Sequence, residues 1–497
     1  MVVSIPEHLE VLCVAVLAIL VSSLARAEDG QYRPSLTSAI HHDISPALRD
    51  LIPTSAEASR ANGSIGQVGT TNFLNIAGMA SAGTYLDADP NGAVGATQYV
   101  QWTNARYAVF DKVTGKVVLP PTTAKNLWLG FGGSCETTNA GDGIVLYDQL
   151  AGRWVITHHT GNPAPYLQCF AISTTSDATG TYYRYSFQLT QQYPDWPKVG
   201  LWPDAYYVAA NLLDPVSFAS LDAQVCALDR VSMLAGAAAT AQCFQTGTPT
   251  LDYVLMPASL DGMTPPKAGV PNYLLSLNAN SLDLFKFHVD WVNPIHSFLK
   301  GPHNIVVQSF SPACLGGVCV PQLGTTQLLD SVGDRLMYRL AYRNFGDHEA
   351  LVVNHSVNDP TAAFAGVRWY EIRSPGGNPV VYQTGTWMPD SSSRWMGSIA
   401  MDKLGDIMLG YTISSTAMYP SSAFTGRLAT DPAGTMQAEN YVGIGLGFKT
   451  DYHWGDYSSM SIDPVDDCTF WFTTEYMRAS GSAWATRIAS MKFPSCQ

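Results

Sequence analysis

An internal repeat of hairpin-like segments is the feature that most constrains the fold. Each segment has a polar or aromatic start, a strand of apolar and small residues, a turn rich in Asp, Asn or Gly, and a second strand. The five clearest copies are GDGIVLYDQLAGRWVI at Gly141, WPDAYYVAANLL at Trp202, GDRLMYRLAYRNFGDHEALVV at Gly333, RWMGSIAMDKLGDIMLGY at Arg394 and WGDYSSMSIDPVDDCTFWFT at Trp454. This pattern is typical of β-hairpins.

The spacing of these starts indicates a closed ring. Asp142 and Asp204 are 62 residues apart, as are Arg394 and Asp456, and the 130 residues from Asp204 to Asp334 leave room for one more start, supplied by VPNYLLSLN at Val270. With a further unit at NGAVGATQYVQW, the repeat predicts an all-β fold, a seven-bladed β-propeller over residues 65–497. The segment from Gly66 would supply its closing strand. Six or eight blades, or tandem β-sandwiches, are the alternatives.

Composition excludes two classes of protein. Only 13% of the 497 residues are charged, 46% are hydrophobic, and the formal net charge is -13. Such a chain is neither intrinsically disordered nor a basic nucleic-acid binder. The 42 glycines and 30 prolines also suit turns and strands better than helices.

The N-terminal segment predicts secretion, to an extracellular or periplasmic location. Residues 11–24 form a short apolar run that ends at Ala25-Arg26-Ala27, a small-x-small cleavage pattern. Residues 1–27 are therefore expected to be a signal peptide, with no membrane span after its cleavage. An uncleaved anchor is the alternative, because acids replace the usual basic residues before the run. Residues 28–64 are expected to form an N-terminal arm or pro-segment.

Eight cysteines remain after the predicted signal peptide, an even number for an oxidising compartment. They lack the spacing of a zinc site and fall into four neighbouring couples. The predicted disulfides are Cys135 with Cys169, Cys226 with Cys243, Cys314 with Cys319, and Cys468 with Cys496.

If the strand starts face one channel mouth, their polar residues converge there. These are Asp142, Asp204, Asn272, Asp334, Arg335, Arg394 and Asp456. Asp204, Asp456 and Asp142 are the candidate catalytic residues, because paired carboxyl groups perform acid and base catalysis. The candidate substrate-binding residues are Arg335, Arg394 and Arg427 for acidic sugars, and Trp202, Tyr206 and Trp454 for stacking. The alternative is that the acids cap turns and the aromatic side chains form a core.

Motifs for metals and cofactors are weak, so no metal and no cofactor is expected. Asp87, Asp89, Asn91 and Gly92 match half of a calcium loop, but Gln98 stands where a bidentate Glu belongs, which gives a structural calcium ion little support. A turn explains Asp347, His348 and Glu349 better than metal ligation with His355. The chain has no G-x-S-x-G, HExxH or phosphate-loop motif.

Two segments resemble the Asp-box turns of sialidase-type propellers. They are SIAMDKLGDIMLGY with Ser398, Asp402 and Gly405, and SIDPVDDCTFW with Ser461, Asp463 and Trp471, although their spacing departs from the usual motif. The stretch from Asn91 to Cys496 is similar to a group of secreted bacterial β-propeller proteins. This resemblance implies the fold and the compartment, and it carries over no catalytic residues.

Together these features predict a secreted, monomeric, glycan-active propeller. It would be a glycoside hydrolase or polysaccharide lyase that acts on an extracellular glycan at the channel mouth. The alternative is a non-catalytic extracellular module that binds a carbohydrate or a surface protein, since propellers host both kinds of function.

Overall fold

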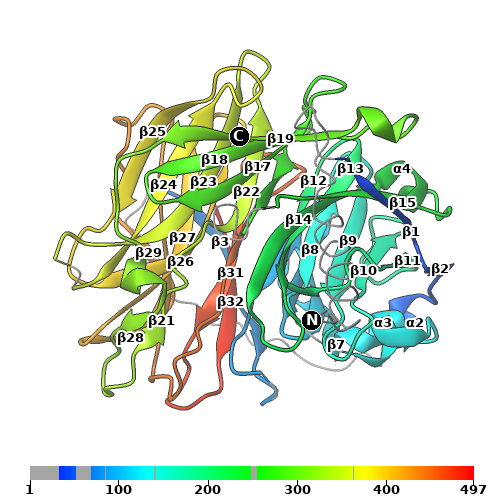
Figure 1. Cartoon of the computed structure of the whole chain (residues 1–497). Helices are drawn as coiled ribbons and strands as arrows, with labels where there is room; N and C mark the ends of the chain where they lie inside the picture. Colours follow the sequence, from blue (N-terminus) through cyan, green and yellow to red (C-terminus); the bar gives the residue numbers. More distant parts are fainter. Residues whose placement is uncertain (1–32, 52–68, 84, 139–140, 248–253, 362) are drawn as a thin grey trace, which may run out of the picture.

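The computed structural model describes residues 33–497 except 52–68, 84, 139–140, 248–253 and 362 (Figure 1). The predicted signal peptide and parts of the predicted arm therefore lie outside the described residues. Within them, no helix is long and apolar enough to cross a bilayer.

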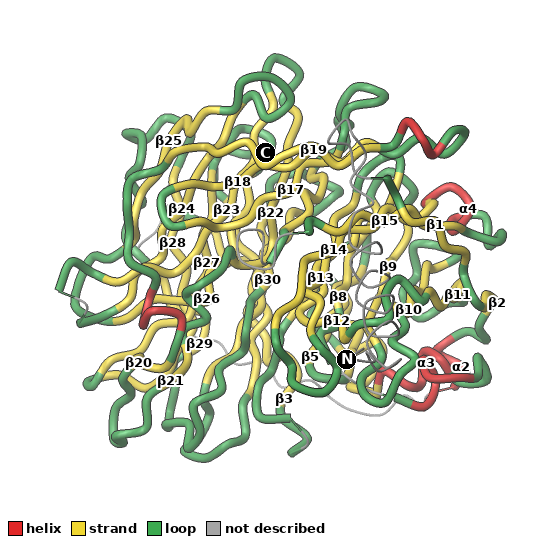
Figure 2. The backbone as a smooth tube through the Cα atoms, viewed as in Figure 1, coloured by secondary structure: helices red, strands yellow, loops and turns green. Residues whose placement is uncertain are grey.

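The fold is all-β, as predicted, and the helices of the described residues are short and lie in connections (Figure 2). The first sheet contains β4 (Asn91–Val94), β5 (Gln98–Thr103), β6 (Arg106–Asp111) and β7 (Val117–Thr123). The second contains β8 (Ile144–Asp148), β9 (Arg153–His159), β10 (Gln168–Ser173), β11 (Tyr182–Phe187) and, at its outer edge, β2 (His41–Ile44). The third contains β12 (Tyr193–Leu201), β13 (Ala205–Leu213), β14 (Ser220–Asp229), β15 (Thr240–Gln245) and β1 (Ser35–Ser38).

An eight-stranded sheet follows along the chain. One half contains β16 (Met256–Asp261), β17 (Asn272–Asn278), β18 (Ser281–His288) and β19 (Phe298–Val306). The other half contains β22 (Met337–Asn344), β23 (Glu349–Asn358), β24 (Ala365–Arg373) and β25 (Val380–Trp387). The halves are joined by parallel pairing of β16 with β22, whereas all other pairs of neighbouring strands in the sheets are antiparallel in the described chain.

Two four-stranded sheets complete the arrangement. They are β26 (Ser393–Met401), β27 (Ile407–Ser415), β28 (Met418–Arg427) and β29 (Asn440–Gly443), and then β30 (Ser459–Ile462), β31 (Phe470–Tyr476), β32 (Ala485–Lys492) and β3 (Thr71–Ala80). The smaller elements are β20 (Val318–Val320), β21 (Leu329–Asp330), α2 (Leu48–Leu51), α3 (Gly133–Thr137), α4 (Arg230–Leu234) and the 3-10 helices η1 (Ala124–Trp128), η2 (Pro294–His296) and η3 (Ala313–Gly316).

The inner strands form a closed ring. Contacts run from β4 to β8, β12, β16, β22, β26, β30 and back to β4. This radial arrangement of small sheets is propeller-like, which confirms the prediction at that level. We call the end of the ring where these inner strands begin the start face, and the opposite end, where each inner strand turns into its second strand, the turn face.

Closure uses a strand from the N-terminal side. β3 pairs antiparallel with β32, with Ile76 opposite Ile488, so residues more than 400 positions apart share one sheet. Residues 33–44 add outer strands to two neighbouring sheets, and Arg184 holds Asp43 of β2 through a two-bonded ion pair. The N-terminal segment therefore ties several parts of the ring together.

Local sequence explains the tight turns. After β6, the Asp111 carboxylate accepts bonds from the backbone N–H groups of Val113 and Thr114, and Gly115 adopts φ 69°, a conformation that favours glycine. The four predicted disulfides are present: Cys135–Cys169, Cys226–Cys243, Cys314–Cys319 and Cys468–Cys496. The last of these links the turn after β30 to the C-terminal segment.

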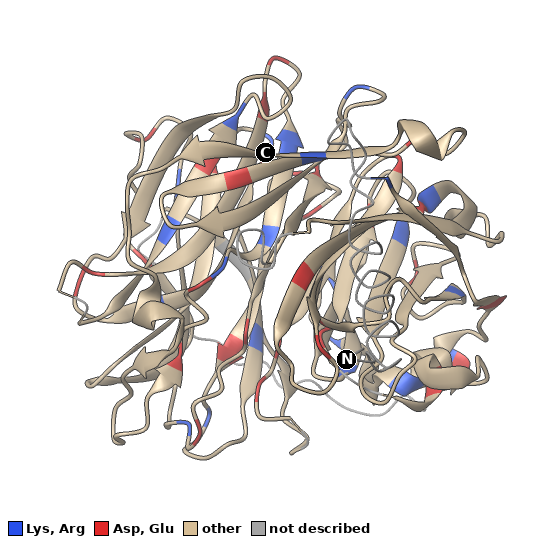
Figure 3. Cartoon of the chain, in the orientation of Figure 1, with Lys and Arg blue, Asp and Glu red and all other residues tan. Residues whose placement is uncertain are grey.

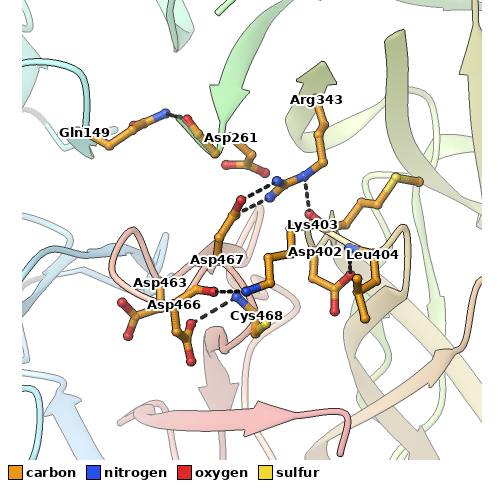
Figure 4. A network of polar contacts seen from close by, with 12 residues as sticks. Gln149, Asp261, Arg343, Asp402, Lys403, Leu404, Asp463, Asp466, Asp467 and Cys468 are labelled. Atoms are coloured by element: carbon orange, nitrogen blue, oxygen red, sulfur yellow. Dashed lines mark hydrogen bonds and ion pairs between the residues drawn. The ribbon is translucent and has the colours of Figure 1, made fainter. Parts of the chain in front are cut away.

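Three pairs of an arginine and an aspartate lie on the turn face. Arg339 binds Asp261 through Nη2, Arg230 binds Asp148 with two bonds, and Arg343 binds Asp467 with bonds of 2.7 and 2.8 Å (Figure 4). Across the described residues, charged residues are few, and acidic and basic residues are intermixed (Figure 3). The pairing on the turn face is structural, because each of these acids already has its cation.

Both Asp-box-like segments form the turns that follow inner strands. Asp402 Oδ1 accepts bonds from the N–H groups of Leu404 and Asp406, and Asp463 Oδ1 accepts one from Val465. These aspartates stabilise the turns. Lys112 pairs with Asp463 at 3.0 Å, whereas Asp402 Oδ2 is buried without a hydrogen-bond partner in the described structure.

Asp402→Asn is expected to reduce the loss of stability as pH rises. Burial, together with the charge of Asp406, raises the pKa of Asp402 to about 7, above the value of about 3.9 in an unfolded chain. The native state therefore binds the proton more tightly, and stability present below pH 4 is lost as pH rises through 7, by up to about 1.4 kcal/mol per pH unit. Urea unfolding from pH 4 to 8 should show a flatter profile for the variant.

A matched turn provides the control for this prediction. Asp463→Asn removes the partner of Lys112 and should lower the free energy of unfolding at pH 7, whereas Asp402→Asn should raise it at that pH. Parallel pH profiles for Asp402→Asn and the parent protein would contradict a raised pKa at Asp402.

Candidate functional site

The start face carries backbone conformations that L-residues rarely adopt. Asp89 (φ 42°), Asp142 (φ 46°) and Asp456 (φ 45°) lie just before β4, β8 and β30, and Trp196 (φ 54°) lies at a bulge within β12. Each such conformation costs about 1 to 3 kcal/mol for a bulky side chain and is found most often at functional sites. Three inner strands are thus preceded by an aspartate in the same conformation at the same end of the ring, and a fourth inner strand, β12, has this conformation at its bulge.

Asp142 is the centre of a polar cluster. Its Oδ2 lies 3.7 Å from Nε2 of His159, and its Oδ1 lies 4.0 Å from Nζ of Lys198. The hydroxyl of Tyr457 donates a bond of 3.3 Å to the same Oδ1, and the Asp142 N–H donates to Asn104 Oδ1 at 3.1 Å. The partners come from β9, β12, the segment before β30 and the β5–β6 turn, so the ring itself assembles this cluster.

Lys198 is buried between two aromatic rings. Its Nζ lies 3.8 Å from the centre of a Trp196 ring and 4.1 Å from that of Tyr457. The guanidinium of Arg335 lies 5.1 Å from the Trp196 ring. Burial lowers the pKa of Lys198 to about 8, although the charge of Asp142 opposes this change. Cation–π contacts compensate part of the hydration that both cations lose.

Two carboxyl groups of this cluster have opposite pKa shifts. Burial and the charge of Asp142 raise the pKa of half-buried Asp195. Burial acts in the same direction on Asp142, but the nearby His159 and the charge of Lys198 outweigh it, so its pKa lies below the ordinary value. Neighbouring carboxyl groups that prefer opposite protonation states can act as an acid and a base.

A second group of carboxylates lies beside this cluster. One oxygen from each of Asp87, Asp89 and Asp456 lies within 4.8 Å of the others, and this is the one group of such ligand atoms found among the described residues. Asp89 is 3% exposed, and its Oδ2 accepts a bond of 2.7 Å from Asn104. Burial, followed by the charge of Asp87, raises the pKa values of Asp89 and Asp456 well above their ordinary range.

A buried ion pair fixes the two loops that carry these carboxylates. Lys449 Nζ donates to Glu475 Oε1 at 3.1 Å and to the carbonyl oxygen of Leu86, and both charged side chains are fully buried. Glu475 Oε2 accepts a bond from the N–H of Gly455 at 3.1 Å. One ion pair therefore connects the segment before Asp87 to the segment before Asp456.

Aromatic side chains continue outward from His159. Tyr193 packs edge-on against His159 at 5.8 Å, Tyr166 at 5.6 Å and Phe218 at 5.5 Å, measured between ring centres. Phe218 is half exposed and Tyr193 is half-buried. Tyr193 and Phe218 therefore provide an accessible aromatic surface next to the polar cluster, whereas Tyr166 and His159 are buried behind it.

The structure places Asp142, Asp456 and Arg335 on the start face. Tyr457, next to Asp456 in the chain, donates a bond to Asp142, and Arg335 lies over the Trp196 ring, which packs against Tyr457. Asp334 lies there too, but it is exposed and paired with Arg335 at 2.8 Å.

The expected convergence of Asp204 with these residues is wrong. Asp204 follows β12, and Arg230 binds both the carbonyl of neighbouring Pro203 and Asp148 at the end of β8. Asp204 therefore lies on the turn face, as does Asn272, which begins a second strand. The error arises because first and second strands have the same apolar pattern, so the repeat was read from β13 and β17 instead of β12 and β16.

The other predicted contacts also serve the fold. Arg394 is buried and binds Asp390 and Glu439, and Arg427 lies opposite Ile407 at the turn face, bound to the carbonyl of Asp431. The predicted stacking residues are all buried and bonded within the protein: Trp202 to the Val270 carbonyl, Tyr206 to Asp148 and Trp454 to Thr412.

The predicted turn explains Asp347 and His348, which form an exposed pair at 2.8 Å, while His355 is buried against Tyr370.

The sequence analysis missed His159, Asp195 and Lys198. Two sequence signals could have indicated these residues. One is the doublet His158-His159 at the end of a strand, and the other is the segment Asp195-Trp196-Pro197-Lys198, where Pro interrupts an apolar strand.

No protein-family model and no curated protein sequence matches the chain. Solved structures align with it at low identity. An ulvan lyase of a polysaccharide lyase family has 10% identity and a TM-score of 0.39, over 84% of this chain and 97% of that one. The exo-β-1,3-galactanase of Phanerochaete chrysosporium has 10% identity and a TM-score of 0.31, over 87% and 99%. A neuraminidase-like protein of A/flat-faced bat/Peru has 9% identity and a TM-score of 0.33, over 79% and 99%.

Proposed function

We propose that this protein is a secreted glycoside hydrolase that acts at the start face. The observation that carries the proposal is Asp142, which lies within 4.0 Å of His159 and Lys198 and whose charge acts on Asp195 at the same bulge of β12 as Lys198. On the turn face, Asp148, Asp261 and Asp467 each have a bonded arginine, whereas Asp142 has its lysine only at 4.0 Å. Four disulfides support a secreted location.

We further propose that the ring has seven blades and acts as a monomer. The two halves of the eight-stranded sheet each contain four consecutive strands and count as separate blades joined by β16 and β22. The other sheets supply the remaining five. In this arrangement Asp142, Lys198 and Arg335 come from three different blades around one channel, the place where propellers usually bind ligands.

In the proposed reaction, the two carboxyl groups have different roles. Asp195, kept protonated by burial and by the charge of Asp142, donates its proton to the oxygen of the glycosidic bond as that bond breaks. Asp142, kept ionised, either takes a proton from the water that attacks the sugar carbon or attacks that carbon itself, in which case water then hydrolyses the covalent glycosyl intermediate. Arg335 and Lys198 provide the positive charge for an acidic substituent, and Tyr193 and Phe218 offer faces for sugar stacking.

The test is an assay of the purified protein on a panel of acidic and neutral polysaccharides. Hydrolysis releases new reducing ends without double bonds, whereas elimination gives unsaturated products that absorb ultraviolet light. New reducing ends alone support the proposal. Unsaturated products would overturn the hydrolase assignment in favour of a lyase, and binding without any product would favour the non-catalytic module.

Asp195→Asn is expected to lower kcat on polysaccharides by about 10² to 10³, because the leaving sugar then departs without a proton. An aryl glycoside with a good leaving group needs little protonation, so its turnover should fall by less than about tenfold. The ratio of the two losses is the measurement. Equal losses on both substrates would show that Asp195 is not the acid.

A further inference from the structure

We infer that Asp87, Asp89 and Asp456 form a binding site for a divalent cation, with Ca²⁺ as the preferred ion. This goes beyond the proposed hydrolase activity, since it uses side chains with no part in that reaction. Asp87 and Asp89 come from the segment before β4 and Asp456 from the segment before β30, 367 residues after Asp89.

The first observation is the spacing of the oxygens. Two oxygens bound to one Ca²⁺ at about 2.4 Å can be no more than about 4.8 Å apart. One carboxylate oxygen from each of the three aspartates meets this limit, all three lying within 4.8 Å of one another. Mg²⁺, with bonds of about 2.0 to 2.1 Å, would require a tighter set.

The second observation is an oxygen without a partner. Asp89 is 3% exposed, and its Oδ2 is satisfied by Asn104, but Asp89 Oδ1 receives no hydrogen bond from the described residues. A buried carboxylate oxygen left unpaired costs more than an unpaired neutral group. A cation held between Asp89, Asp87 and Asp456 would satisfy this oxygen and offset the repulsion among the three charges.

The site is fixed before any ion binds. Lys449 bonds to the carbonyl of Leu86, next to Asp87, and through Glu475 it holds the N–H of Gly455, next to Asp456. Both loops are therefore tied to one buried pair, which limits the rearrangement that binding requires. Asp87 and Asp456 are only half-buried, so water can complete the coordination.

The donors select the class of ion. All three are carboxylates, the ligands that hard cations prefer, and the group contains no sulfur or imidazole donor that would favour zinc or copper. The remaining residues of the apparent calcium loop serve elsewhere: Asn91 Oδ1 accepts from the N–H of Val145, and Gln98 bonds to Asp177 and Ala178. Asp456 therefore supplies the acidic ligand that the last residue of a local calcium loop would otherwise supply.

The test uses the full-length secreted protein after removal of metals with a chelator. Isothermal titration with CaCl₂ is expected to show one site with a Kd of about 10⁻⁴ M, and an excess of a hundred times Kd should raise Tm by roughly 3 °C. Mg²⁺ should bind at least tenfold more weakly. Bound terbium should give luminescence sensitised by the neighbouring aromatic side chains, and added Ca²⁺ should displace the terbium and reduce this luminescence.

Asp89→Asn and Asp456→Asn should each weaken Ca²⁺ binding at least tenfold. Asp195→Asn makes the same Asp-to-Asn change on the start face without removing a ligand, so its Ca²⁺ affinity should stay within about threefold of the parent. Absence of both heat and terbium signal at millimolar Ca²⁺ would overturn the proposal, and so would equal losses in all three variants. Binding is measured without substrate, so its result is independent of the proposed hydrolysis.

Discussion

Asp142→Asn is expected to lower kcat on the polysaccharide substrate by about 10³, the upper part of the range for a lost base or nucleophile. The amide keeps the shape of the side chain and can still accept a bond from Tyr457, but it cannot accept a proton or attack a sugar carbon. KM should change little if Arg335 and the aromatic surface near Tyr193 carry most of the binding. Initial rates over a range of substrate concentrations separate kcat from KM.

Asp204→Asn is the matched control, because both aspartates adjoin an inner strand but at opposite ends. Asp204 bonds only to Tyr207 among the side-chain contacts described, and its variant should keep kcat within about twofold. Thermal unfolding of both variants checks that they remain folded. If Asp204→Asn were inactive and Asp142→Asn active, catalysis would belong to the turn face and the proposed site would be wrong.

The comparison of Asp142 with Asp204 also shows how far the sequence could predict the site. Hairpin period, Gly-rich turns and cysteine couples are local patterns, and they predicted the all-β ring, its closure through β3 and all four disulfides. Strand direction is not local. Successive antiparallel strands carry the same apolar pattern while their starts alternate between the two faces, so Asp204 was assigned to the wrong end.

Contacts within the site were beyond sequence reasoning for a related reason. His159 ends a second strand and Asp195 and Lys198 flank a bulge in an inner strand, so no fixed spacing relates them to Asp142. The same holds for Asp89 and Asp456, whose approach depends on the closure of the ring. Only the chain path around the whole ring brings these residues together.

Glu475→Gln is expected to lower the free energy of unfolding by about 3 to 5 kcal/mol, because it leaves the ammonium of Lys449 buried without its counter-charge. Burial raises the pKa of Glu475 to about 7 despite the attraction of Lys449, so urea unfolding at pH 8 compares the variant with an ionised carboxylate. The amide oxygen can still accept the bond from Gly455, which isolates the loss of charge from the loss of the loop contact.

A double-mutant cycle decides whether the charge pair is the cause. Lys449→Met removes the ammonium, so the double variant Lys449→Met/Glu475→Gln contains neither buried charge, and its loss should be smaller than the sum of the single losses by at least about 2 kcal/mol. Additive losses would mean that the two side chains act independently. Lys449 also bonds to the carbonyl of Leu86, beside Asp87. The double variant should therefore recover stability, because neither buried charge remains, but it should not recover full Ca²⁺ affinity, because the loop that positions Asp87 has lost this bond.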